Sequence, residues 1–175
     1  MAAGSTIYKA QLNIADMDRN YYETHDLTVA QHPSETDQRL MMRLAAFALN
    51  ASDRLVITKG IGGDDEPELW EKDYSGDVVV WIDLGQMDEK RLRKSCGRAE
   101  QVIVYTYNLK SATAWWKQNG TTFARFKNLR VVHLNAEGIE KLCERSMRLQ
   151  ATISDGELSL HSDRGDVTIL QDVWQ

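Results

Sequence analysis

The sequence predicts an α/β (α+β) protein with a compact mixed β-sheet and flanking helices. Alternating polar and apolar residues in the first 31 positions predict an N-terminal hairpin. Residues 77–107 show a strand, helix, strand succession, and residues 148–174 have the pattern of a C-terminal antiparallel meander with Asp155-Gly156 at its first turn. The meander either covers one edge of the main sheet or pairs with the opening hairpin to form a second small sheet.

The opening hairpin leads into a helix. Residues 7–14 and 21–31 are strand-like and are separated by a polar turn, and Pro33 ends the second stretch. Ser34 is expected to begin a capping box with Asp37, and apolar residues at helical spacing predict an amphipathic helix over 35–49.

An acidic loop and a buried strand follow. After a β-rich run at 54–58, the loop has acids in four of the five positions 64–68. Residues 77–84 are apolar almost throughout, which is typical of a central strand, yet Asp83 lies near the end of that run. A buried charge without a partner is costly, so we expect Asp83 to need a metal ion or a basic side chain.

The second half alternates helices and strands. Asp88 has the position of an N-cap for a helix over 88–99, and 102–107 is a strong strand. A helix over 111–119 is expected to stop at Gly120, and a strand over 129–134 follows. A further helix is expected from Asn135, with an inward face formed by Ile139, Leu142, Cys143 and Met147.

Length and composition place bounds on the function. The 175 residues suit a single domain over 1–175, and 42% hydrophobic with 27% charged residues is typical of a globular protein. The net charge of −5 means that a nucleic acid would have to meet a local basic patch. No apolar run is long enough for a membrane span and no leader is recognised, so we expect a cytoplasmic protein without membrane contacts. The oligomeric state stays open.

Several kinds of chemistry lack support in the sequence. The chain has no Gly-x-Ser-x-Gly element, and the glycines at 60–63 match neither a phosphate loop nor a dinucleotide fingerprint, so no nucleotide cofactor is expected. Cys96 and Cys143 have no Cys-x-x-Cys partner and are expected to be core residues.

A pair of acids and a basic helix are the strongest functional candidates. Glu68 and Asp83 are hard oxygen ligands of the kind that Mg²⁺ or Mn²⁺ prefers. Five cations occupy nine positions of the helix that follows, and three of them recur at i, i+3 and i+7, so they share a face that can track phosphates. The five are Lys90, Arg91, Arg93, Lys94 and Arg98, and the three are Arg91, Lys94 and Arg98. The alternatives are that Glu68 is a local cap and that the helix face is merely solvated.

Long sequence blocks are similar to those of the YaeQ family of small bacterial proteins. The blocks are His32-Pro33-Ser34-Glu35-Thr36, Asp64-Asp65-Glu66-Pro67-Glu68-x-Trp70, Trp81-Ile82-Asp83-Leu84-Gly85, Asp88-Glu89-x-Arg91-x-x-Lys94, Trp115-Trp116 and Leu149-Gln150-Ala151-Thr152-Ile153. The resemblance implies a variant of the PD-(D/E)XK nuclease core, in which Pro67-Glu68 and Asp83 match the acidic positions. The motif lysine, two residues after Asp83, is replaced by Gly85. Lys94 is the first candidate to substitute for it and Lys59 the second.

These observations predict a Mg²⁺-dependent (or Mn²⁺-dependent) nuclease-like protein that acts on or binds the backbone of DNA or RNA. Glu68 and Asp83 would hold the metal and Lys94 would polarise water or phosphate. Lys90, Arg91 and Arg98 would position the nucleic acid, with Glu35 and Lys59 in supporting roles. The alternative is a catalytically inactive nucleic-acid-binding or protein-interaction module, in which the acids pair internally with Arg91 and Lys94 or the acidic loop contacts a protein.

Overall fold

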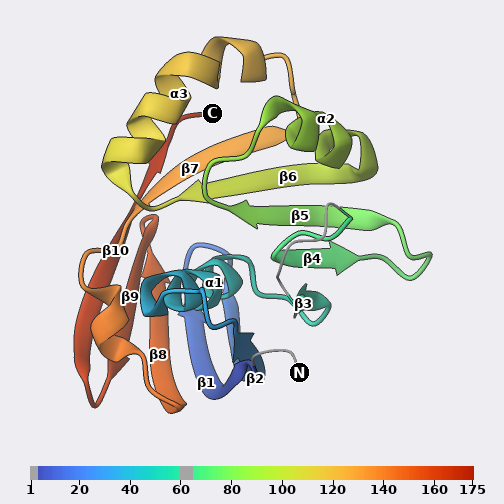
Figure 1. Ribbon diagram of the computed structural model, residues 1–175. Helices are drawn as coiled ribbons and strands as arrows, with labels where there is room; N and C mark the ends of the chain where they lie inside the picture. The colour runs from blue at the N-terminus through green and yellow to red at the C-terminus, as the bar shows by residue number, and fades with distance from the viewer. Residues whose placement is uncertain (1–3, 60–64) are drawn as a thin grey trace. The chain divides into compact units, whose positions relative to one another are not determined.

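The computed structural model describes residues 4–59 and 65–175, which form two compact units (Figure 1). One unit contains the chain up to Ala51 together with Ala136–Leu170, and the other contains Ser52–Asn135 with Gln171–Gln175. Each unit combines a sheet with helical structure, so the predicted mixed α+β class is confirmed. Whether the whole chain behaves as a single domain stays a prediction.

The sheet of the first unit joins the two ends of the sequence. Its strand order is β2-β1-β8-β9-β10, and the strands are β1 (Thr6–Asp16), β2 (Tyr21–Gln31), β8 (Ser146–Ser154), β9 (Glu157–Ser162) and β10 (Gly165–Val173). The predicted hairpin and the predicted antiparallel meander are both confirmed. Because β1 pairs with β8 as a parallel neighbour, the hairpin and the meander form one sheet.

Asp155 and Gly156 form the first turn of the meander, as the sequence predicts. Asp155 and Gly156 both have positive φ, at 53° and 78°, as a two-residue hairpin turn requires. The Asp18 carboxylate accepts hydrogen bonds from both of their backbone amides, each at 2.8 Å. This contact ties the turn of the meander to the turn between β1 and β2.

Helix α1 (Asp37–Asn50) confirms the amphipathic pattern but not its expected cap. Thr36 is the N-cap, and its hydroxyl accepts from the Arg39 amide at 3.1 Å. The capping box expected at Ser34 is therefore wrong. Ser34 instead hydrogen-bonds the His32 ring in the turn before the helix, and the helix begins after Thr36.

The second unit contains the strand, helix, strand succession. Its elements are β3 (Leu55–Ile57), β4 (Leu69–Lys72), β5 (Val78–Leu84), α2 (Glu89–Arg98), β6 (Ala99–Thr106), α3 (Leu109–Phe123) and β7 (Leu129–Asn135). The strand order is β7-β6-β5-β4-β3. Strands β5, β6 and β7 are parallel to one another, and β4 is antiparallel to both β5 and β3. After β10, Trp174 and Gln175 hydrogen-bond the backbone of Val131 in β7.

The core of this unit lies between one face of the sheet and its two helices. Leu92 of α2 and Phe123 of α3 pack with Trp81 of β5 and with alternate residues of β6 and β7. The helices therefore cover the same sheet face, and Figure 1 shows them together over β5, β6 and β7. Asp83 is two residues from Trp81 and so belongs to this covered face.

Helix α3 runs past its expected end. The prediction placed it at 111–119 with Gly120 as the stop, but the helix continues through Gly120 to Phe123. Gly120 is present because of packing: a Cβ there would lie 3.0 Å from the Trp116 indole. The glycine allows a close approach within the helix rather than ending it.

The helix expected from Asn135 to Met147 is wrong. Only a short 3-10 helix, η1 (Ile139–Leu142), forms there, and it follows Gly138 in the left-handed conformation. Met147 belongs to β8 and pairs in register with Ala10 of β1. Ile139, Leu142 and Met147 are buried, as expected, whereas Cys143 is only partly buried. Pairing with a strand distant in sequence determines the backbone conformation at Met147.

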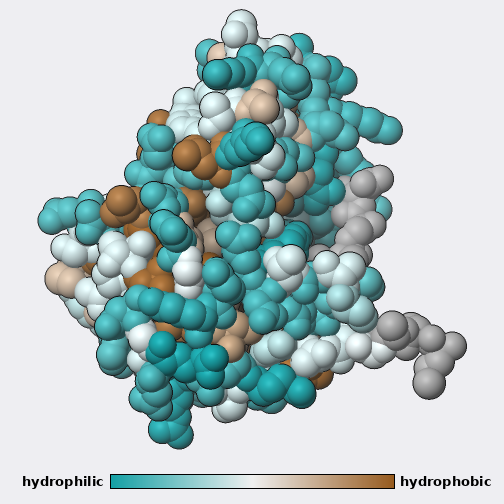
Figure 2. Space-filling model, turned by 60° about the vertical axis from the view of Figure 1, so that its left-hand side comes forward, coloured by the Kyte–Doolittle hydropathy of each residue, from teal (hydrophilic) through white to brown (hydrophobic). Residues whose placement is uncertain are grey.

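Polar residues dominate the face of the molecule drawn in Figure 2, where hydrophobic residues occur in small groups. In the part of the chain that the structure describes, no helix has the length and apolar character required to span a membrane.

Candidate functional site

The two candidate metal ligands lie opposite each other, Asp83 in β5 and Glu68 directly before β4. Leu69 of β4 pairs with Ile82 of β5, so Glu68 precedes β4 opposite Asp83. The Glu68 amide donates to the Ile82 carbonyl at 3.0 Å. Because side chains alternate along strands, both acids belong to the sheet face covered by α2. Both residues are buried.

Asp83 is held by three donors. The Arg91 guanidinium contacts it through both fork positions, Nε to Oδ2 and Nη2 to Oδ1, each at 2.9 Å. The Trp81 indole Nε1 donates to Oδ2 at 3.0 Å. The Asp83 side chain is 2% exposed and that of Arg91 22%. The cation that the apolar strand led us to expect is therefore present, and it is an arginine.

The start of α2 sets the position of Arg91. Asp88 caps the helix and accepts from the Arg91 amide at 2.8 Å, as predicted for the N-cap. This places Arg91 in the first turn, directed at the end of β5. Its Nη2 also donates to the Glu66 carbonyl at 3.0 Å, so one guanidinium connects the strand end to the loop before β4.

The exposed cations of α2 contact the same loop. Lys94 Nζ lies 2.7 Å from the Asp65 carboxylate, and Arg98 Nη1 donates to the Asp65 carbonyl at 2.9 Å. Lys94 and its hydrogen bond hold the pKa of Asp65 below its ordinary value. Lys94 thus contacts the acidic loop, and Lys90 is an exposed residue of the same helix. Asp64, which precedes Asp65 in this loop, lies outside the described residues.

Gly85 stands where the resemblance to the nuclease motif leads one to expect a lysine. Its φ is +100°, a conformation that L side chains rarely adopt. Its amide donates to the Tyr105 carbonyl at 2.8 Å, which fixes the backbone there. A lysine at this position in the turn after β5 would be strained.

Glu35 and Lys59, the supporting candidates, occupy different settings. Glu35 belongs to the first unit, where its carboxylate pairs with Arg39 and Arg43 at 2.6 Å each. Both arginines lie on α1, so Glu35 stabilises the beginning of that helix. Lys59 is exposed and lies just after Thr58, whose amide donates to the Glu68 carbonyl at 2.9 Å.

Within residues 4–59 and 65–175, no group of three or more His, Cys, Asp or Glu side chains is arranged to hold a metal ion. Glu68 and Asp83 are the two carboxylates that were expected to hold Mg²⁺. Asp83 already accepts three hydrogen bonds, two of them at Oδ2. A carboxylate has about four acceptor positions, so about one is left.

Two partners in this site were not expected from the sequence. The Trp81 indole donates to Asp83 and orients it, and the i, i+2 spacing of the two residues on one strand was the available signal. Asp65 was one acid among several in the loop, and nothing in the sequence distinguished it as the partner of Lys94.

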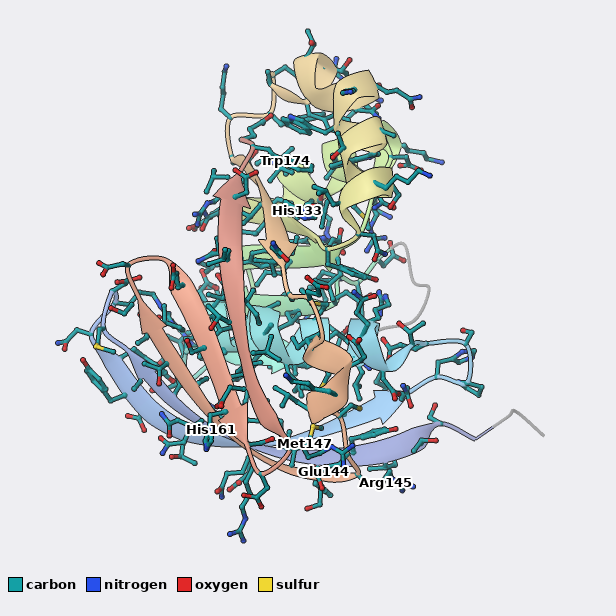
Figure 3. The ribbon with its side chains drawn as sticks, turned by 90° about the vertical axis from the view of Figure 1, so that its left-hand side faces the viewer. His133, Glu144, Arg145, Met147, His161 and Trp174 are labelled. Atoms are coloured by element: carbon teal, nitrogen blue, oxygen red, sulfur yellow. The ribbon has the colours of Figure 1, made fainter. Side chains whose placement is uncertain are left out.

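A second polar group lies in the core of the same unit. His133 of β7 stacks on Trp174 with ring centres 5.2 Å apart and an interplanar angle of 5°, and Figure 3 shows the two residues close together. Its Nδ1 lies 2.8 Å from the Thr106 hydroxyl. Burial lowers the pKa of His133, while Asp172 acts in the opposite direction. His133 therefore favours the neutral form.

Comparison with known proteins identifies the family. The family model described as YaeQ protein matches residues 1–171. The YaeQ protein of Escherichia coli strain K12 is 43% identical over 100% of this chain and 98% of its own length, and that of Salmonella typhi is 42% identical with the same coverage.

Solved structures agree with the sequence comparison. The crystal structure of the YaeQ protein from Xanthomonas axonopodis pv. citri superposes with a TM-score of 0.94 at 48% identity, covering 98% of each chain. That from Pseudomonas syringae gives a TM-score of 0.92 at 32% identity, covering 98% of this chain and 96% of the other. The chain therefore belongs to the YaeQ family.

Proposed function

We propose that this protein binds the phosphodiester backbone of a nucleic acid along the exposed cations of α2, without hydrolysing it through Asp83. The scaffold of this proposal is a variant of the PD-(D/E)XK nuclease core. In this proposal Glu68, which directly precedes β4, and Asp83 of the antiparallel neighbour β5 take the acidic positions of the motif, and the parallel strand β6 follows after α2.

The observation that carries the proposal is the two-pronged contact of Arg91 with Asp83. The guanidinium supplies the positive charge that a divalent cation would supply to this carboxylate. A planar fork matched to both oxygens is a strong form of ion pair, and Trp81 adds a third donor. With Arg91 and Trp81 in place, about one acceptor position of Asp83 is left for Mg²⁺, which would then lie close to the like-charged guanidinium.

The turn after β5 supports binding without hydrolysis. The motif lysine is thought to orient or activate the attacking water, and Gly85 occupies its position with a φ of +100°. Lys94, the first candidate to replace that lysine, contacts Asp65 at 2.7 Å instead of the Asp83 carboxylate. Neither position supplies an amine at Asp83.

The cations left on the surface of α2 are suited to phosphate contacts. Lys90, Lys94 and Arg98 recur at i, i+4 and i+8 and are exposed, so they lie along one side of the helix. Phosphate contacts of this kind bind nucleic acid without reading its sequence.

Fluorescence anisotropy with labelled single-stranded and duplex DNA and RNA tests the binding. We expect the double variant Lys94→Gln with Arg98→Gln to weaken binding and to lower the slope of log affinity against log salt by about two units, one for each lost phosphate contact. Lys110→Gln with Lys117→Gln on α3 makes the same change in net charge and should leave the slope unchanged. If the two double variants show the same slope of log affinity against log salt, α2 is not the binding surface.

Mg²⁺-dependent hydrolysis is the second candidate, and the in-register placement of Glu68 opposite Asp83 favours it. Glu68 and Asp83 would be the ligands that hold Mg²⁺ or Mn²⁺, and Lys94 would polarise water or phosphate. Incubation with single-stranded, duplex and branched DNA and with RNA in each metal tests this. Cleavage that disappears in Asp83→Asn would establish hydrolysis and overturn the proposal of binding alone.

A further inference from the structure

The Asp65 contact has the form of an anion bound to the basic helix. Its carboxylate lies 2.7 Å from Lys94 Nζ, and its carbonyl accepts from Arg98 Nη1 at 2.9 Å. One residue thus presents two oxygens to two cations of the same helix. A phosphate group also presents oxygens to neighbouring basic side chains, so the two kinds of ligand suit the same pair.

The contact is exposed and therefore open to exchange. The Lys94 side chain is 43% exposed and that of Asp65 84%. Exposed ion pairs of this kind contribute little to stability, because water and salt screen both charges. A phosphate can take the place of Asp65 without disturbing the buried contact between Arg91 and Asp83.

The charges at this position also favour an added anion. Arg98 donates to a carbonyl, which carries no net charge, so its positive charge is not neutralised there. Lys94 has one carboxylate, and the pKa of Asp65 is lowered by that contact. The Arg98 guanidinium lies over the Trp81 ring, 5.2 Å from its centre, which orients it beside Lys94.

We propose that Lys94 and Arg98 form a phosphate-binding pair, and that Asp65 occupies this pair until a backbone phosphate of a nucleic acid replaces it. The inference rests on the proposed function and extends it: Asp65 competes with the ligand and lowers the affinity of the free protein. Only an exchange of one anion for another is involved, so no bond is made or broken.

The variant Asp65→Asn removes the competing charge at an exposed side chain. We expect it to bind a short labelled single-stranded DNA oligonucleotide about fivefold more tightly than wild type, the effect of one close charge contact in water. Glu23→Gln on the exposed part of β2 is the control, since it changes net charge equally. Its affinity should stay within about twofold of wild type, because charges farther away than a Debye length are screened.

A double-mutant cycle localises the effect. In a Lys94→Gln background, Asp65→Asn should no longer increase affinity, because the side chain with which Asp65 competes is gone. If Asp65→Asn behaves like Glu23→Gln while wild type binds through Lys94 and Arg98, the inference is wrong and the proposed function stands. If wild type and Asp65→Asn both fail to bind the oligonucleotide, the proposed function and the inference are both wrong. If Asp65→Asn strengthens binding equally with and without Lys94, the competition does not take place at this pair.

Discussion

Asp83 and Arg91 differ in their access to water, and this difference decides what each loses when its partner is removed. The Asp83 side chain is 2% exposed and the Arg91 side chain 22%. In Arg91→Met, a buried carboxylate is left without its cation, which costs about 3–5 kcal/mol. In Asp83→Asn, the stranded guanidinium still reaches water, and we expect a loss of about 1–3 kcal/mol.

Urea unfolding of the two single variants measures this asymmetry. Arg91→Met should lose more unfolding free energy than Asp83→Asn. The slope of that free energy against urea concentration should stay unchanged in both variants. The opposite order would mean that Asp83 is stabilised by groups other than Arg91.

His133 gives the protein a pH-dependent contribution to stability. Because burial lowers its folded-state pKa below the ordinary 6.5, the unfolded chain binds the proton more readily than the folded protein. The contribution of neutral His133 is therefore complete above about pH 6.5 and decreases as the pH falls through the folded-state pKa.

Melting temperatures from pH 7.5 to pH 5 test this sign. We expect the melting temperature of wild type to fall with pH more steeply than that of His133→Gln. If the melting temperatures of wild type and His133→Gln fall equally with pH, His133 does not contribute to the pH dependence of stability.

Single residues show what the sequence alone could and could not predict about the site. Asp83 stands out because a carboxylate in an apolar strand needs a cation, and the structure provides one. Which cation it would be was open, because Arg91 and Lys94 lie on the same helix. The choice depends on the first turn of α2, where the Asp88 cap directs Arg91 at the strand end.

Two glycines in helices of the second unit have opposite roles. At Gly120 in α3 a Cβ would lie 3.0 Å from Trp116, whereas at Gly97 in α2 nothing lies within 4 Å. Gly120→Ala should destabilise the protein by about 1–3 kcal/mol through overpacking, despite the better helix propensity of alanine. Gly97→Ala should stabilise it by up to about 1 kcal/mol.

Denaturant unfolding of Gly120→Ala and Gly97→Ala measures both changes in stability. Because the substitution is the same and both positions are helical, the difference isolates the contact with Trp116. A stabilising effect at both positions would show that the indole moves away at no cost.

Elements with local signals were predictable, and elements built by distant contacts were not. The Asp155-Gly156 turn and the Asp88 cap each depend on neighbouring residues, and both are confirmed. The segment after Asn135 carries apolar residues at helical spacing, but β8 pairs with β1, more than a hundred residues earlier. Strand β4 has only four residues and shows no alternating pattern that could separate it from the acidic loop.

The two units share the chain in an interleaved way. The first unit takes both ends of the sequence up to Leu170, and the last residues of β10 belong to the second. Three chain crossings connect the units, at 51–52, 135–136 and 170–171. The length of the chain predicts a single domain, and we expect the units to unfold together.

The distribution of tryptophan makes this testable without new variants. All five tryptophans, Trp70, Trp81, Trp115, Trp116 and Trp174, belong to the second unit. Tryptophan fluorescence therefore reports on that unit, whereas far-UV circular dichroism reports on both. Coincident transitions in urea would support one cooperative domain, and separate midpoints would divide the chain into two.

In the folded protein, we infer that Arg91 takes the place of a divalent cation at Asp83. The most direct measurement is the melting temperature of wild type and Asp83→Asn, each with and without millimolar Mg²⁺. A ligand that binds the folded state raises the melting temperature, so a metal held by Asp83 would be visible as a shift that only wild type shows. We expect Asp83→Asn to melt several degrees below wild type, and Mg²⁺ to shift both proteins equally. A Mg²⁺-dependent rise in wild type alone, with equal stability of the two metal-free proteins, would show instead that Asp83 holds a metal ion.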